Sequence, residues 1–197
     1  MPTVVVPFRG AEGKSRLAQL PLATRGALGE AMLADVLVAC GSLGAVYVVT
    51  PVQLPAVAAT VIADRGGGQG AAVRAGLEAA VAAGSPAPYL VLNADLPCVT
   101  ARDLLALAGS IPEGGLALAP AADGTTNALA FATVGLFEPV YGPGSAGRFA
   151  ALGPSRMLDT PNLVDDVDTI EDLERLRSRV GLNTSRLLAR LQLGAAA

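Results

Sequence analysis

The chain has 197 residues, enough to bury a sizeable hydrophobic core. Its formal net charge of −3 leaves no broad basic surface for nucleic acid, and the absence of histidine excludes a Ser-His-Asp triad, a Cys-His dyad and a histidine-ligated metal. Because the apolar runs are too short to cross a bilayer and no basic leader precedes the first of them, we expect a cytoplasmic protein without a membrane partner.

Apolar, β-branched segments alternate with Ala- and Leu-rich segments along the first half of the chain. We read the apolar, β-branched segments as buried parallel strands, at residues 3–8, 45–50, 60–63 and 89–93. We read the Ala- and Leu-rich segments 24–38 and 71–83 as helices. We also expect a short helical turn at 55–59 and a helix that begins at Thr100. This βαβα order predicts a doubly wound, mostly parallel sheet.

The pattern changes after residue 110. Two strand candidates, 116–120 and 128–133, are joined by a loop rather than a crossover helix, which favours an antiparallel addition to the sheet. The remaining expected helices are 146–152 and 169–179. We therefore predict a single α/β domain over residues 1–197, with helices on both faces of the sheet and residues 182–197 as a helical C-terminal tail.

Two acidic turns lie far apart in the sequence. Asp95 follows an apolar strand candidate, whereas Asp165, Asp166 and Asp168 stand just before a helix. Taken singly, each could be a strand-ending or helix-capping acid. Mg²⁺ prefers oxygen ligands and usually takes one or two protein carboxylates beside substrate phosphates. Together with a basic loop near the N-terminus, the two turns favour a site for Mg²⁺ and phosphate.

The basic loop follows the first strand candidate and holds two glycines and the cations Arg9, Lys14 and Arg16. Such a loop can wrap phosphate oxygens with backbone N–H groups and side-chain charge. Its glycine spacing fits neither a P-loop nor the G-x-G-x-x-G dinucleotide fingerprint. Taken alone, an exposed basic turn explains the loop equally well.

A glycine-rich loop follows the third strand candidate and ends in Gly68, Gln69 and Gly70. Consecutive glycines let the backbone approach a flat or phosphorylated ligand closely, and the Gln69 amide can read the edge of a base. These three residues are candidate nucleotide contacts, with a plain flexible connection as the alternative.

Five motifs occur along the chain in order. They are the loop Lys-Ser-Arg-Leu-Ala (14–18), the strand end Asp-Leu-Pro (95–97), the loop Gly-Thr-Thr-Asn-Ala-Leu (124–129), the turn Tyr-Gly-Pro-Gly-Ser (141–145) and Asp-Val-Asp-Thr (166–169). The set resembles the guanylyltransferases that activate phosphoenolpyruvate or 2-phospho-L-lactate on the way to the deazaflavin redox coenzyme F-420. The resemblance covers the chain up to about residue 181.

The resemblance implies a nucleotidyltransferase fold with a Rossmann-like sheet, GTP as the nucleotide donor and a phosphorylated three-carbon acid as the acceptor. It implies a downstream deazaflavin transferase as the functional partner, and a homodimer is compatible with the amphipathic tail. By position, it assigns one or two Mg²⁺ ions to the metal ligands Asp95, Asp166 and Asp168. Asp165 is expected to lie outside this set and to face solvent.

The same resemblance places the phosphorylated acid at Asn127, Gly142 and Ser145, and it places Arg9 and Lys14 near the phosphates. A phosphate oxygen of the acid would attack the α-phosphorus of GTP, which needs no general base because that phosphate is already ionised. Lys14 and Arg16 would offset charge on the departing pyrophosphate.

Other functions remain open at this point. A nucleotidyltransferase acting on a sugar phosphate or the molybdenum cofactor is the nearest alternative, although such enzymes usually carry a Leu-Ala-Gly-Gly turn that residues 6–9 lack. A non-catalytic nucleotide-binding module is the other, and it has little need for three converging acids. Of the two acids, we favour phosphoenolpyruvate, because the Ala- and Gly-rich composition suggests a high-GC bacterium and bacterial relatives tend towards it.

Overall fold

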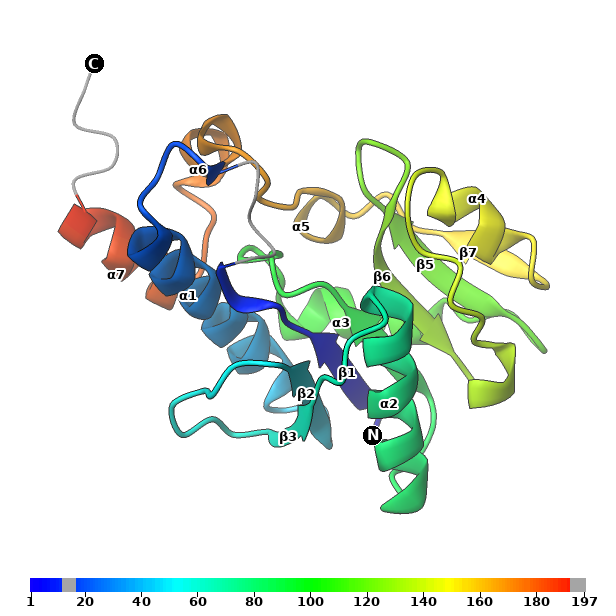
Figure 1. Cartoon of the computed structure of the whole chain (residues 1–197). Helices are drawn as coiled ribbons and strands as arrows, with labels where there is room; N and C mark the ends of the chain where they lie inside the picture. Colours follow the sequence, from blue (N-terminus) through cyan, green and yellow to red (C-terminus); the bar gives the residue numbers. More distant parts are fainter. Residues whose placement is uncertain (12–16, 192–197) are drawn as a thin grey trace.

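A computed structural model describes residues 1–11 and 17–191, and within them seven strands form one twisted sheet (Figure 1). In chain order the strands are β1 (Thr3–Pro7), β2 (Val46–Thr50), β3 (Thr60–Ala63), β4 (Tyr89–Leu92), β5 (Leu116–Pro120), β6 (Thr126–Phe131) and β7 (Ser155–Met157). Across the sheet they follow the order β3-β2-β1-β4-β6-β5-β7.

One half of the sheet is parallel and the other is mixed. Strands β3, β2, β1 and β4 run parallel to one another, β6 runs antiparallel to β4 and β5, and β7 is parallel to β5. The predicted parallel sheet with an antiparallel addition is therefore confirmed. The carboxyl ends of the parallel strands open at one edge, which is where open α/β sheets bind their ligands.

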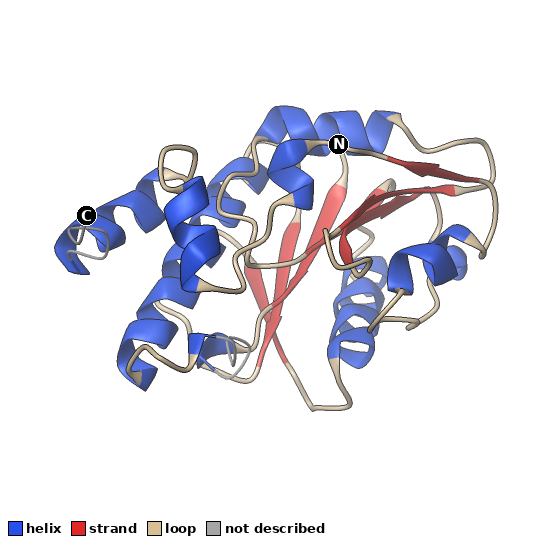
Figure 2. Ribbon diagram, turned by 90° about the horizontal axis from the view of Figure 1, so that it is seen from above, coloured by secondary structure: helices blue, strands red, loops and turns tan. Residues whose placement is uncertain are grey.

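Helices cover both faces of the sheet (Figure 2). Within the described residues they are α1 (Leu22–Cys40), α2 (Gln69–Ala82), α3 (Ala101–Gly109), α4 (Ser145–Ala150), α5 (Pro161–Val164), α6 (Ile170–Leu176) and α7 (Leu182–Leu191), with a 3₁₀ turn, η2, at Val134–Leu136. None of these helices is both long and apolar enough to cross a bilayer.

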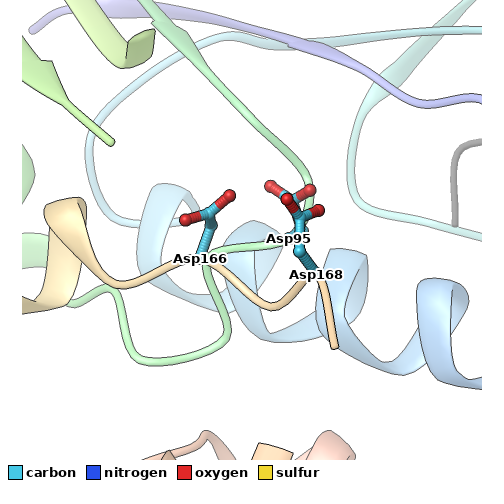
Figure 3. A group of neighbouring side chains, drawn as sticks. All are labelled: Asp95, Asp166 and Asp168. Atoms are coloured by element: carbon cyan, nitrogen blue, oxygen red, sulfur yellow. The ribbon is translucent and has the colours of Figure 1, made fainter. Parts of the chain in front are cut away.

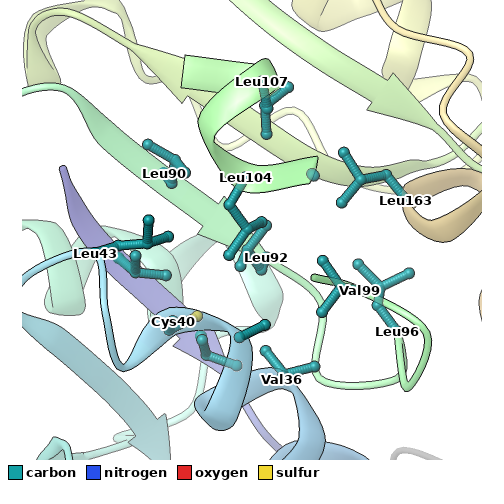
Figure 4. Packing of buried hydrophobic residues seen from close by; sticks show 14 of the residues in the cluster. Val36, Cys40, Leu43, Leu90, Leu92, Leu96, Val99, Leu104, Leu107 and Leu163 are labelled. Carbon is teal, nitrogen blue, oxygen red and sulfur yellow. The ribbon is translucent and has the colours of Figure 1, made fainter. Parts of the chain in front are cut away.

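The central strands alternate between two hydrophobic cores. Val4 and Val6 of β1 pack with α1 and α3 in one cluster, part of which Figure 4 shows. Val5 packs in the opposite cluster, with α2 and α4. All three valines are fully buried, as expected of a parallel strand that is covered on both faces.

Two expectations about the edge of the sheet are wrong. Residues 55–59 form bends rather than a helical turn. Strand β3 was expected to be buried, but three of its four residues are exposed because it pairs only with β2 at the sheet edge. On the mixed side, β6 begins at Thr126, two residues before the predicted start, and this shift matters for the site described below.

Helix α7 is held in place by a buried carboxylate of α1. Asp35 is 5% exposed and accepts hydrogen bonds of 2.9 Å from the backbone N–H groups of Asn183 and Thr184. A third bond of 2.9 Å comes from the Asn183 side chain. The two backbone donors lie in the first turn of α7, so Asp35 caps that helix from another element.

We expect Asp35→Ala to lower the free energy of unfolding by about 2 kcal/mol, since it removes a helix cap and strands buried N–H donors. Urea denaturation at neutral pH measures the effect. The matched control is Glu30→Ala, which removes an exposed acid from the same helix. Equal losses in the two variants would show that Asp35 has no special role in holding α7.

Candidate active site

The two acidic turns meet at the carboxyl edge of the parallel strands. Asp95 lies just after β4, and Asp166 and Asp168 lie between α5 and α6. The backbone N–H of Val167 donates to the carbonyl oxygen of Asp95 over 3.0 Å, and the Val167 side chain is fully buried. This bond, together with the buried valine, fixes the second turn against the first.

Three carboxylates come together at this point (Figure 3). One oxygen from each of Asp95, Asp166 and Asp168 lies within 4.8 Å of the others. Ligands at about 2.1 Å from Mg²⁺ lie no more than about 4 Å apart, so small side-chain movements would let one ion touch all three. The geometry and the all-oxygen donor set fit the Mg²⁺ ligands expected from the sequence, although Mg²⁺ binding itself stays a prediction.

The surroundings of Asp166 disfavour its negative charge. Burial raises the pKa of Asp166 to about 6, with further contributions from the charges of Asp95 and Asp168, while a hydrogen bond from the Asn127 side chain opposes the shift. A cation between the three carboxylates would favour the ionised form of Asp166 and so oppose this shift.

Asp165 stays outside the cluster, as expected, but the prediction that it faces solvent is wrong. Its two oxygens accept hydrogen bonds of 2.6 Å from Arg175 and 2.7 Å from Arg179, and 20% of its side chain is exposed. Burial opposes ionisation of Asp165, but the hydrogen bonds from Arg179 and Arg175 outweigh it and lower its pKa. These ion pairs anchor the acidic turn to α6 and the residues that follow it.

A cavity of 270 Å³ opens on one side of the acids, toward β6 and α4. Its lining residues are Gln69, Asn93, Asp95, Asp123, Thr125, Thr126, Tyr141, Gly142, Ser145, Asp166 and Asp168. A second cavity, of 230 Å³, opens toward β1 and α2. Its lining residues are Pro7, Phe8, Arg9, Gly10, Gly29, Asp64, Gln69, Ala72, Asn93, Ala94 and Asp95. Three polar side chains, Gln69, Asn93 and Asp95, line both cavities.

The turn before α4 and the first residue of that helix supply two of the expected acceptor residues to the first cavity. Gly142 has a φ of +105°, which favours glycine, and Arg148 holds the turn by donating to three backbone carbonyls within residues 140–143. Ser145 is fully buried and shares a 2.9 Å hydrogen bond with the Thr126 hydroxyl. The structure thus brings Gly142 and Ser145 to the same cavity as the acids.

Asn127, the third residue expected at the acceptor, has a different position. It lies within β6 rather than in the preceding loop, and only 2% of its surface is exposed. Among the described residues that line either cavity, Asn127 is absent. Its side-chain nitrogen donates to the carbonyl oxygen of Val164 over 3.0 Å.

The three residues expected to contact the nucleotide also differ in whether they line a cavity. Gln69 lines both cavities, and Gly68 lies in an adjoining hollow that Arg9 also lines. Gly70 sits in the first turn of α2, where an added Cβ would lie 2.5 Å from the Cβ of Pro139. That glycine is therefore required for close packing of the helix.

The two remaining cations of the basic loop, Lys14 and Arg16, lie outside the described residues. Conversely, the sequence analysis did not single out Asn93, Asp64 or Asp123, all of which line a cavity. Asn93 and Asp64 each directly follow a parallel strand, and a polar residue at that edge of the sheet is the signal that could have identified them.

Comparison with known proteins places the chain among nucleotidyltransferases. A model of the MobA-like NTP transferase domain matches residues 15–190. The chain is 35% identical to the 3-phospho-D-glycerate guanylyltransferase of Phenylobacterium zucineum, over 98% of this chain and 97% of that protein. It is 36% identical to the phosphoenolpyruvate guanylyltransferase of Nocardia farcinica, over 90% of this chain and 85% of that protein.

Other matches are partial or more distant. A phosphoenolpyruvate guanylyltransferase of Sphaerobacter thermophilus is 38% identical, but the matched part spans only 57% of either protein. A crystal structure of a candidate nucleotide-diphospho-sugar transferase from Desulfovibrio desulfuricans G20 superposes with a TM-score of 0.73 over 97% of this chain and 95% of that one. At 17% sequence identity, this last likeness concerns the fold alone.

Proposed function

This chain belongs to the family of MobA-like NTP transferase domains and is a nucleotidyltransferase, and on that premise we propose that it transfers GMP from GTP to a small phosphorylated carboxylic acid, with phosphoenolpyruvate as the first choice. The observation that carries the proposal is the cluster of Asp95, Asp166 and Asp168, which lines one cavity and, through Asp95, also lines the second. A transferase needs two substrates to meet at one charged centre, and this cluster offers that arrangement.

In the proposed reaction, a phosphate oxygen of the acid attacks the α-phosphorus of GTP. A new P–O bond joins the acid phosphate to GMP, the bond between the α- and β-phosphates breaks, and pyrophosphate leaves with that electron pair. No side chain has to remove a proton from the attacking phosphate, which agrees with a chain that has no histidine. The protein's task is to align the two phosphates and to offset their charge.

Each cavity suits one substrate. GTP fits the cavity that reaches β1 and α2, where Arg9 and Gln69 lie. The acid fits the cavity beside Gly142 and Ser145, which present backbone and hydroxyl groups to an anion. Lys14 and Arg16 belong to the same basic loop as Arg9, and their positive charge would stabilise the departing pyrophosphate.

Asp95, Asp166 and Asp168 would hold one or two Mg²⁺ ions between the two substrates. A bound Mg²⁺ ion supplies positive charge where negative charge accumulates on the phosphates. The three acids themselves would set where that charge is placed, because Asp95 lies in the turn after β4 and the other two lie in the turn that is bonded to it.

The names of the relatives and the shared chemistry of their substrates favour a phosphorylated three-carbon acid as the acceptor. Two of the relatives are named for phosphoenolpyruvate and one for 3-phospho-D-glycerate. Phosphoenolpyruvate, 3-phospho-D-glycerate and 2-phospho-L-lactate are all three-carbon carboxylic acids that carry one phosphate group. The product contains a phosphoanhydride bond, so a downstream deazaflavin transferase in coenzyme F-420 biosynthesis could transfer its phosphorylated acid, with GMP as the leaving group.

A matrix of substrates tests the proposal. Pyrophosphate release is followed with GTP, ATP, CTP or UTP, in the presence of Mg²⁺ and each of the three acids. We expect release to need GTP and an acid together, with the highest kcat/KM for phosphoenolpyruvate. A higher kcat/KM for another acid would overturn the choice of acceptor, and a preference for another nucleotide would overturn the guanylyltransferase assignment.

A further inference from the structure

One arginine of α4 binds the peptide groups of the turn before that helix. The Arg148 guanidinium donates to the carbonyl oxygen of Val140 from Nε over 3.1 Å and from Nη2 over 2.9 Å. Its Nη2 also donates to the carbonyl oxygen of Tyr141 over 3.1 Å, and its Nη1 donates to that of Pro143 over 2.6 Å. Long side chains of a helix lean toward its N-terminus, so Arg148, in the last turn of α4, reaches back to this turn.

The carbonyl oxygens of residues 140–143 are all occupied within the protein. Arg148 binds three of them, and the remaining one, that of Gly142, accepts from the Ser145 N–H over 2.9 Å. A carbonyl oxygen directed at a bound carboxylate or phosphate would repel it, because all these oxygens carry negative charge. The contacts with Arg148 and Ser145 therefore draw the acceptor oxygens of the turn into the protein.

The same contacts set the direction of the Gly142 N–H. The C=O and N–H of a trans peptide point in opposite directions, and the bond between Tyr141 and Gly142 is trans. Since the Tyr141 C=O points to Arg148, the Gly142 N–H points away from the guanidinium. Tyr141 and Gly142 line the first cavity, and within the described part of the chain the Gly142 N–H donates to no backbone acceptor. That N–H can therefore donate to an anion in the cavity.

Arg148 also places a positive charge behind this peptide group. None of the ion pairs between described residues includes Arg148. Its hydrogen bond to the Tyr141 carbonyl oxygen polarises the peptide group and strengthens the Gly142 N–H as a donor. Direction and polarisation thus both favour an anion beside Gly142.

We propose that Arg148 is a positioning residue for the acceptor acid, because it turns the Tyr141–Gly142 peptide group so that the Gly142 N–H faces the acid. The inference rests on the proposed function for the identity of the acid. Arg148 is absent from the described lining of the first cavity, so it acts through the turn and not by contact. Neither Tyr141 nor Gly142 belongs to the described lining of the second cavity, where GTP is proposed to bind.

Steady-state kinetics of Arg148→Ala separate this role from a general loss of structure. We expect the KM for phosphoenolpyruvate to rise by about 10-fold or more, which is the effect of losing a hydrogen bond to a charged group. The KM for GTP and kcat should stay close to the wild-type values. Arg190→Ala removes an exposed arginine from the last turn of α7 and is the matched control, with all three parameters unchanged.

Arg148→Lys keeps the charge, but its single ammonium group cannot hold three carbonyl oxygens in the arrangement that a planar guanidinium holds. It should therefore recover only part of the affinity for the acid that Arg148→Ala loses. Full recovery would show that charge alone suffices and would contradict the orienting role. An unchanged KM for the acid in Arg148→Ala, or an equal rise in the KM values for acid and GTP, would overturn the proposal.

An NMR measurement tests the orientation without any transfer reaction. The chain contains one Tyr-Gly sequence, at residues 141–142, so ¹³C at tyrosine carbonyls and ¹⁵N at glycine give a single correlation from this peptide group. In the wild type, phosphoenolpyruvate with Mg²⁺ should move the Gly142 amide proton downfield. Arg148→Ala should need about 10-fold more acid for the same movement.

Absence of this movement in the wild type with phosphoenolpyruvate, 3-phospho-D-glycerate and 2-phospho-L-lactate alike would overturn the inference. Movement of the Gly142 amide proton without guanylyl transfer would contradict the proposed function and support the role of Arg148. The two failures are therefore distinguishable.

Discussion

Replacing Asp95 or Asp168 with asparagine is expected to lower turnover by at least about 10²-fold while leaving the fold intact. The loss should exceed the roughly 10- to 100-fold effect of removing a residue that only orients a metal ligand, because these carboxylates would touch the ion themselves. Both side chains lie in the three-acid cluster, and asparagine preserves their size while removing the charge. Neither substitution empties a space in the hydrophobic core, so folding should survive.

Initial rates at saturating GTP, acid and Mg²⁺ measure the loss, and circular dichroism checks the fold. Asp159→Asn is the matched control, since Asp159 is an exposed acid that lines neither cavity. We expect Asp159→Asn to retain wild-type turnover. Near wild-type turnover in Asp95→Asn or Asp168→Asn at saturating Mg²⁺ would contradict the assignment of the three acids as metal ligands of the reaction.

Asp166→Asn is expected to have two opposite effects, a large loss of activity and a gain in stability of the metal-free protein above about pH 6. The pKa of Asp166 is raised from 3.8 to about 6. The folded state therefore binds this proton more tightly than the unfolded state, so ionising Asp166 destabilises the fold as the pH rises from about 4 to about 6. A difference of about 2 pKa units corresponds to about 3 kcal/mol as an upper limit.

Denaturant unfolding in EDTA at pH 4 and pH 7.5 measures this effect. The stability gain of Asp166→Asn over the wild type should be close to zero at pH 4 and fully present at pH 7.5. Mn²⁺ in place of EDTA should narrow the difference at pH 7.5, because only the wild-type carboxylate recovers stability from the ion. An equal gain at both pH values would show that Asp166 does not titrate in this range.

The fold was largely accessible from the sequence because its parallel strands are apolar runs of the right length, separated by helices with clear ends. The predicted helix opening at Thr100 is real, with a capping box between Thr100 and Asp103. Strand β7 and helix α5 went unpredicted, because both are very short and all three residues of β7 are exposed. Local pattern gives little signal for such elements, which depend on contacts with the rest of the chain.

The candidate site was accessible only in part. The two acidic turns could be selected because acids at strand and helix ends have a recognisable chemistry, and the family resemblance singled out Asp95, Asp166 and Asp168 within them. The convergence of these three acids is seen in the structure. The position of Asn127 was misjudged, since two polar residues at the start of β6 read as loop. Their burial comes from the pairing of Thr126 with β5 and from the hydrogen bonds of Asn127 with Asn93 and Val164, neither of which local sequence reveals.

The most direct test of the account is a ³¹P NMR spectrum of the wild-type reaction with GTP, phosphoenolpyruvate and Mg²⁺, recorded beside that of Asp168→Asn. We predict that the wild-type spectrum gains the resonance of pyrophosphate and a pair of coupled doublets from the new phosphoanhydride, in equal amounts. The variant should show neither over the same time. Pyrophosphate without the coupled doublets, or GDP and inorganic phosphate in their place, would contradict guanylyl transfer at this site.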